Sequence, residues 1–169
     1  RNDIPALAVE VRAFDWTDVP PDYGRPQDLI NKYLDECDIF VGILWRRWGT
    51  PTGGFTSGFE EEFERVIRRR EAEGVPKIWL FFREPNIRDP SCLPEEETGQ
   101  LKRVMLFRRN IESSQALLYR SFRRPAELKA QLRDLIIDHI LRQNGPAIPQ
   151  PICSVTHAFP HRGVAVAGH

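Results

Sequence analysis

The side chains best suited to chemistry are concentrated in one segment, residues 45–63, which begins Trp-Arg-Arg-Trp-Gly-Thr and ends Ser-Gly-Phe-Glu-Glu-Glu-Phe. Indole rings can stack on a nucleobase, and guanidinium groups and the free N–H groups of a helix start can hold phosphate. The segment has neither the GxxxxGK[ST] order of a P-loop nor the GxGxxG order of a Rossmann turn. It therefore predicts a nucleotide pocket of another kind, with these binding residues: Trp45, Arg46, Arg47, Trp48, Gly49, Thr50, Ser57 and Gly58.

Three consecutive glutamates follow, at the start of a helix that the apolar spacing predicts over residues 59–73. Ser57 and Glu60 have the S-x-x-E spacing of a capping box. On a helical wheel Glu61 falls opposite the buried stripe and is expected in solvent, whereas Glu60 and Glu62 lie on the two flanks of the stripe, half shielded from water. Glu62 has no capping task, so we take it as the catalytic candidate. A half-buried carboxylate beside a ribose stabilises a developing oxocarbenium ion, which is what cleavage of an N-glycosidic bond requires.

Simpler explanations exist for the same residues. The helix dipole alone favours acidic residues in a first helical turn. Trp45 can be core packing at a strand end, with Trp48 the half-exposed ring, and the two arginines after Trp45 can pair with Asp38 or with the glutamates. Both explanations remain open at this stage.

The periodicity predicts alternating strands and helices, which is typical of a three-layer α/β fold with a parallel sheet. Residues 38–45 are apolar on both faces, so this strand is expected to be central and covered by helices on each side. Ligands of such folds bind beyond the carboxyl ends of the strands, here the loops 15–26, 45–58 and 82–94. The predicted strands are residues 6–14, 38–45, 77–82 and 116–122, and the predicted helices are 27–36, 59–73, about 95–110 and about 125–143.

Length and composition limit the class of protein. The chain has 169 residues, with 24 Lys plus Arg and 24 Asp plus Glu, so the excess of positive charge typical of nucleic-acid binders is absent. No apolar run approaches the ~18 residues that cross a bilayer. The three cysteines form no CxxC pair, which argues against disulfides or a zinc site and favours a reducing compartment. We expect one domain over residues 1–143 and a disordered tail over 144–169.

The segment from Cys37 through Asp-Ile-Phe-Val-Gly-Ile-Leu-Trp-Arg-Arg-Trp-Gly-Thr-Pro-Thr to Gly53, followed by Ser57-Gly-Phe-Glu-Glu-Glu-Phe63, resembles the TIR-like (Toll/interleukin-receptor-like) domains of unknown function. These domains are found at the N-terminus of bacterial defence proteins and of NTPase-linked signalling proteins. The helix Gln-Asp-Leu-Ile before the motif, the strand Ile-Trp-Leu-Phe-Phe after it and the segment Leu-Tyr-Arg-Ser-Phe further on also match, so the resemblance covers about residues 5–142.

The resemblance implies a flavodoxin-like TIR fold and cleavage of NAD⁺, as a substrate and with no cofactor, to nicotinamide and an ADP-ribose product. It places the catalytic glutamate at Glu62, through the pattern S-x-x-x-x-E-[LF]. It further implies a cytoplasmic immune effector that works by self-association, joined to sensor or NTPase domains and binding neither nucleic acid nor membrane.

Two departures from the family pattern qualify this expectation. The family's first strand, with its SS…D…ER signature, does not precede Arg1, so the domain is expected to lack that strand, and Phe59 replaces the commoner threonine. Two alternatives stay open: a non-catalytic TIR-like oligomerisation module, and another nucleotide N-glycosidic enzyme such as a nucleoside deoxyribosyltransferase-like protein.

Overall fold

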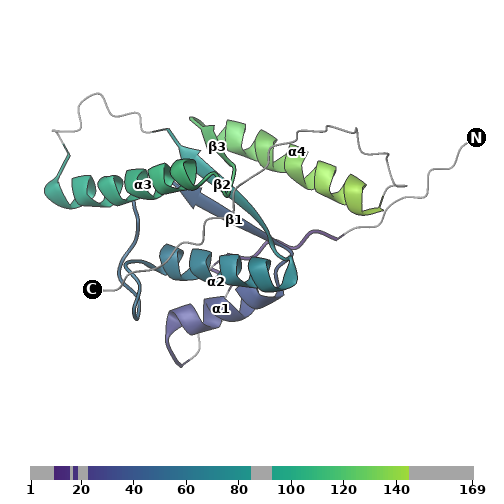
Figure 1. The fold of residues 1–169 in the computed structure, drawn as a ribbon, viewed down its shortest axis with the longest axis horizontal. Coiled ribbons are helices and arrows are strands. Elements are labelled where there is room, and N and C mark those ends of the chain that lie inside the picture. The colour runs from purple at the N-terminus through teal and green to yellow at the C-terminus, as the bar shows by residue number, and fades with distance from the viewer. Residues whose placement is uncertain (1–9, 16, 19–22, 85–92, 145–169) are drawn as a thin grey trace, which may run out of the picture.

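A computed structural model describes residues 10–15, 17–18, 23–84 and 93–144, and within this part of the chain helices and strands alternate (Figure 1). The three strands are parallel and lie in the order β1-β2-β3. The predicted α/β class is therefore confirmed. The elements are α1 (Pro26–Glu36), β1 (Ile39–Leu44), α2 (Gly58–Glu73), β2 (Lys77–Arg83), α3 (Glu95–Ser114), β3 (Tyr119–Phe122) and α4 (Pro125–Asn144).

Helices cover both faces of the sheet, which gives the three layers of a flavodoxin-like arrangement. On one face, Phe59 of α2 packs against Phe40 of β1, with ring centroids 6.4 Å apart. The ring of Phe107 in α3 belongs to the same aromatic cluster, because it meets Phe59 at 5.5 Å. On the other face, His139 of α4 meets the ring of Trp79 edge-on. Helix α1 lies beside α2 (Figure 1).

Strand β1 is an edge strand of the described sheet, and only one of its faces is covered. Phe40 and Leu44 are buried against α2, whereas Val41 is 37% and Ile43 50% exposed on the opposite face. The expectation of a central strand covered on both sides is thus wrong for this strand within the described residues. The reason is that α4, the helix on that face, packs over β2 and β3 and leaves β1 open.

Two of the predicted strands differ from the structure. A strand was expected at residues 6–14, but residues 10–14 form none, and Val11 and Phe14 are more than half exposed. Residues 6–9 lie outside the described part of the chain, as does the predicted tail from residue 145. The strand expected at 116–122 begins only at Tyr119, because Leu118 is 91% exposed and pairs with no neighbouring strand. Apolar alternation alone did not fix where either strand would find a partner.

The covered face contains the core, which gives a direct test of the packing. Leu80 in β2 is 2% exposed, whereas Leu118 before β3 is 91% exposed. We expect Leu80→Ala to lower the free energy of unfolding by about 3 kcal/mol, because the substitution leaves a cavity in a tightly packed layer. Leu118→Ala should leave it unchanged within error. Urea denaturation followed by circular dichroism measures both, and equal effects would contradict the described core.

Candidate functional site

The start of α2 forms the centre of the candidate site. Ser57 is fully buried and is the N-cap residue, since its hydroxyl accepts a hydrogen bond from the Glu60 N–H at 3.0 Å. The Glu60 carboxylate turns back to Thr56, accepting from its N–H and its hydroxyl, each at 2.6 Å. The predicted N-cap is confirmed, although the glutamate side chain bonds the residue before the cap. Through one carboxylate oxygen, Glu60 therefore fixes the entry of the helix.

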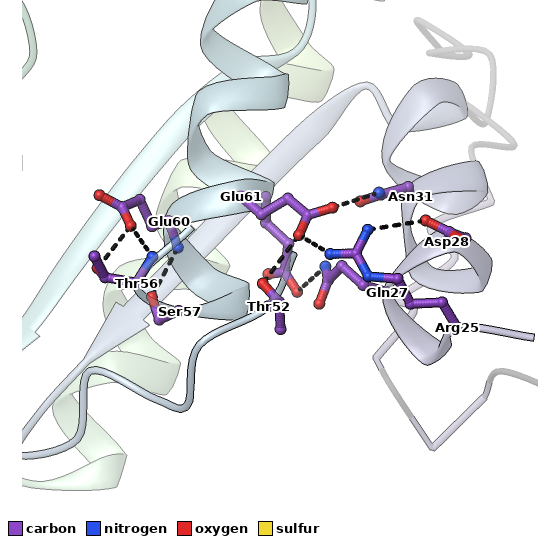
Figure 2. A network of polar contacts seen from close by, with 10 residues as sticks. Arg25, Gln27, Asp28, Asn31, Thr52, Thr56, Ser57, Glu60 and Glu61 are labelled. Carbon is purple, nitrogen blue, oxygen red and sulfur yellow. Dashed lines mark hydrogen bonds and ion pairs between the residues drawn. The ribbon is translucent and has the colours of Figure 1, made fainter. Parts of the chain in front are cut away.

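Glu61 is locked into a buried network that joins α2 to α1 (Figure 2). Its carboxylate accepts hydrogen bonds from Asn31 Nδ2 at 3.2 Å and from the Thr52 hydroxyl at 2.9 Å, and it forms an ion pair with Arg25. The exposed fraction of Glu61 is 7%. The expectation that Glu61 would lie in solvent is wrong, because the wheel considered only the sheet-facing stripe and α1 covers the flank that it left open.

The protonation of Glu61 follows from these contacts. Burial by itself would raise the pKa of this carboxyl, but the hydrogen bonds from Asn31, Arg25 and Thr52, with the charge of Arg25, outweigh burial and lower the pKa below its ordinary value. Glu61 is therefore ionised at neutral pH. A fixed, fully hydrogen-bonded carboxylate of this kind is suited to holding structure together.

Glu62 has a different environment from its two neighbours. It is partly buried, and its carboxylate accepts one hydrogen bond, from Gln27 Nε2 at 3.1 Å. Among the described residues it forms no ion pair. Burial raises the pKa of Glu62, the bond from Gln27 offsets part of that rise, and the negative charge of Glu61 adds to it. Glu62 is thus a partly desolvated carboxylate without a cation, close to the half-shielded state predicted for it.

Helix α1 contributes two buried polar residues that were not among the predicted site residues. Gln27 and Asn31 are 6% and 8% exposed, and they lie four residues apart on one face of the helix. Their spacing was the available signal, because polar side chains repeated at i and i+4 beside an apolar stripe indicate a polar contact with another element. A second contact fixes the same pair of helices: Arg69 of α2 donates to the carbonyl oxygens of Leu34 and Cys37 at the end of α1.

The loop between β1 and α2 is anchored by α3. Gln100 accepts from the N–H groups of Trp48 and Gly49 at 2.7 and 3.0 Å and donates to the carbonyl of Gly49 at 3.1 Å. The Trp48 ring is 6% exposed and contacts the rings of Phe59 and Phe107, and its indole N–H donates to Thr56. The expectation that Trp48 would be the half-exposed ring is therefore wrong.

Trp45 is the exposed tryptophan instead: its exposed fraction is 37%, and it directly follows β1. The guanidinium carbons of Arg46 and Arg83 lie 4.4 and 4.2 Å from the centre of its ring. Arg47 and Thr50 are exposed, and neither Arg46 nor Arg47 forms an ion pair within the described residues. The predicted pairing of these arginines with Asp38 or with the glutamates is thus absent there.

Two hollows lie near these residues. One, of about 270 Å³, is lined by Phe55, Glu61, Arg65 and Arg68 beside the Glu61 network. The other, of about 160 Å³, contains Trp45 and residues of β2 and α3. Glu62 lines neither of them. The structure therefore brings Glu62 together with Gln27, Ser57 and Gly58 at the start of α2, and places Trp45 in a separate hollow.

Residues 4–136 match the family model of a domain of unknown function, DUF4062. The chain belongs to the DUF4062 family. Neither the search of curated proteins nor the search of solved structures found a match to this DUF4062 chain. No helix among the described residues is long and apolar enough to cross a membrane, and no group of three or more metal-ligating side chains gathers in that part of the chain.

The opposite environments of Glu61 and Glu62 predict stability changes of opposite sign. We expect Glu61→Gln to lower the free energy of unfolding by about 2 kcal/mol near pH 7, because it breaks the contact with Arg25. The depressed pKa means that this contribution is present above about pH 4.3 and is lost as pH falls through the folded pKa of Glu61.

Glu62→Gln should instead raise the free energy of unfolding at neutral pH. Its raised pKa means that the folded state pays for keeping the carboxylate ionised, and that cost is absent below about pH 4.3, where Glu62 is protonated in both states. Denaturant titrations of the two variants from pH 3 to 8 measure both differences. Destabilisation of equal size by both substitutions would contradict the assigned environments.

Proposed function

We propose that this DUF4062 chain is a TIR-like domain that cleaves NAD⁺, with Glu62 as the residue that stabilises the ribosyl cation. One observation carries the proposal: of the three glutamates at the start of α2, two are occupied and one is not. Glu60 fixes the helix entry and Glu61 is held by Arg25, Asn31 and Thr52. Among the described residues, Glu62 alone of the three accepts just one side-chain hydrogen bond, from the neutral amide of Gln27, while its carboxylate is partly buried.

The reaction breaks the bond between the ribose C1′ and the nicotinamide nitrogen. Nicotinamide leaves with the bonding electron pair as a neutral base, and positive charge develops on the ribose. An ionised carboxylate in a partly desolvated position stabilises that charge more strongly than one in water would. Water then adds to C1′ and releases a proton, which gives ADP-ribose, nicotinamide and H⁺.

Gln27 is the positioning residue in this proposal. Its side chain is buried, its amide N–H bonds Glu62, and its oxygen lies against Gly58, where an added Cβ would come within 2.9 Å of it. A glycine at position 58 therefore leaves room for the Gln27 amide beside the helix start. The hydrogen bond from Gln27 fixes the Glu62 carboxylate and limits the rise of its pKa.

Of the predicted binding residues, Arg47 and the helix start at Ser57 and Gly58 would hold the phosphates. Trp45 and Arg46 lie at the separate hollow and take no part in this cleavage, and Trp48 is buried in the core. Because Glu62 lines neither hollow, we propose that a second copy completes the substrate cleft, so that activity depends on self-association. The setting would be a cytoplasmic defence protein that also carries sensor or NTPase domains.

Nicotinamide release from NAD⁺ tests the function. The assembled full-length protein should release nicotinamide, and Glu62→Gln should reduce the rate at least about 100-fold, because the charge facing the cation is lost. Glu64→Gln is the matched control, since Glu64 is an exposed carboxylate on the same helix whose one ion pair within the described residues is with Arg68. Its rate should stay within about twofold of the wild type.

Three results would overturn parts of this proposal. Wild-type protein that releases no nicotinamide under several activating conditions would favour a non-catalytic module. Release that persists in Glu62→Gln would remove Glu62 from its role. Base exchange on a deoxynucleoside, without any action on NAD⁺, would identify a deoxyribosyltransferase-like enzyme.

The role of Gln27 predicts a shift in the pH dependence of the rate. Glu62 must be ionised to act, so activity rises with pH through its pKa. Gln27→Met removes the hydrogen bond that lowers this pKa, and the acidic limb of the pH–rate profile should move to higher pH. Gly58→Ala should move it in the same direction by displacing the Gln27 amide. A lower rate with an unmoved profile would indicate a merely structural role.

A different observation favours the association module as second candidate. Strand β1 has no partner on its outer side within the described sheet, and Val41 and Ile43 beside that edge are exposed. Unpaired strand edges readily pair with another chain. This surface can serve self-association with or without catalysis, so the nicotinamide assay above separates the two functions.

A further inference from the structure

The hollow beside Trp45 lies at the carboxyl ends of β1 and β2, where they face α3. Trp45 directly follows β1, and Phe82 and Arg83 are the last residues of β2. In parallel α/β sheets this edge is where ligands bind. The rest of its lining comes from α3: Leu101, Val104, Met105, Arg108, Arg109 and Glu112.

The charge around this hollow is positive. Three arginines and one glutamate line it, and a fourth arginine, Arg46, lies over the Trp45 ring. The single glutamate, Glu112, is already bound by Arg108 and by the hydroxyl of Tyr119. Arg83 and Arg109 form no ion pair with any described carboxylate. Guanidinium groups left without a carboxylate on the rim of a hollow are suited to a phosphate group.

Arg46 adds an independent sign of an absent partner. Its Nε is buried and has no hydrogen-bond acceptor among the described residues. Buried N–H groups in folded proteins nearly always have an acceptor, and one left without an acceptor costs stability. The Arg46 guanidinium carbon lies 4.4 Å from the centre of the Trp45 ring, so its positive charge lies beside the hollow that Trp45 lines.

The floor of the hollow is apolar. Phe82, Leu101 and Val104 are buried there, while Met105 is 51% exposed at the mouth. An inorganic anion alone would leave this apolar surface exposed to water, whereas a ligand that also carries an aromatic ring would cover it. At about 160 Å³ the hollow is smaller than the ~300 Å³ at which pockets begin to enclose drug-sized ligands. It is therefore too small to enclose a dinucleotide.

We infer that this Arg-rimmed hollow beside Trp45 is a binding site for a small aromatic phosphate, separate from the Glu62 site. The phosphate lies between Arg83 and Arg109, with the charge of Arg46 nearby over the Trp45 ring, and the aromatic ring of the ligand lies against Met105 and the apolar floor. The site is independent of the proposed NAD⁺ cleavage, because none of the residues that line it contacts Glu62 or Gln27.

Phenyl phosphate is the probe for this site, titrated into the whole protein by heteronuclear NMR. The indole N–H signal of Trp45, assigned by its loss in Trp45→Phe, should shift and saturate. Phenol and inorganic phosphate should each bind at least about tenfold more weakly, because each lacks one of the two contacts. AMP in the same titration distinguishes the sources: comparable or tighter binding indicates a nucleotide, and weaker binding indicates a single-ring phosphate.

Two arginines on one helix provide the matched comparison. Arg109 and Arg103 are both exposed on α3, but only Arg109 lines the hollow. Arg109→Gln should weaken phenyl phosphate about tenfold, and Arg103→Gln and Glu62→Gln should leave binding unchanged. Equal losses in the two arginine variants, saturation by inorganic phosphate alone, or an unshifted Trp45 signal would each overturn the inference. Because Glu62→Gln retains this site, a failure here is distinct from a failure of NAD⁺ cleavage.

Discussion

The buried contact between Arg25 and Glu61 is the constraint on which the candidate site depends. The network around it connects three parts of the chain: Glu61 belongs to α2, Asn31 to α1 with Arg25 directly before that helix, and Thr52 to the loop after β1. A carboxylate removed from water is tolerable only when its oxygens are fully bonded, so these three parts have one favourable arrangement. That arrangement also places Gln27 beside Glu62. The environment of the proposed catalytic carboxylate is thus a consequence of its neighbour's structural role.

The aromatic cluster under the loop has a comparable function on the other side of α2. Phe107 of α3 contacts Trp48, Phe59 and Phe63, so one ring joins α3, the loop and α2. Gln100, about two turns earlier on the same face of α3, holds the backbone of the same loop. Gln100 of α3 fixes the start of the loop at Trp48 and Gly49, and there the two tryptophans, three residues apart, diverge: Trp48 enters the core and Trp45 remains at the surface. This divergence separates the Arg-rimmed hollow from Glu62.

How far the sequence predicts this structure can be judged from individual residues. The apolar run over residues 38–45 predicted a strand, Ser57 predicted the start of α2, and the apolar spacing predicted its end at residue 73, directly before Gly74, where the chain turns with φ 78°. These predictions depend on contacts within a few residues, which the local sequence contains. Glu62 was also placed correctly at the flank of the buried stripe, since the wheel requires only the face of α2 that meets the sheet.

The sequence by itself determined the α/β alternation, the cap at Ser57 and the half-shielded positions of Glu60 and Glu62, because each follows from the period of the chain and from local hydrogen bonds. Tertiary structure alone decided that Glu61 is buried, that Trp45 and Trp48 exchange their expected exposures, and that β1 is covered on one face. These outcomes depend on which distant element, α1, α3 or α4, packs against a given surface. Helical and strand periodicity report that a face is buried, but they carry no information about its partner.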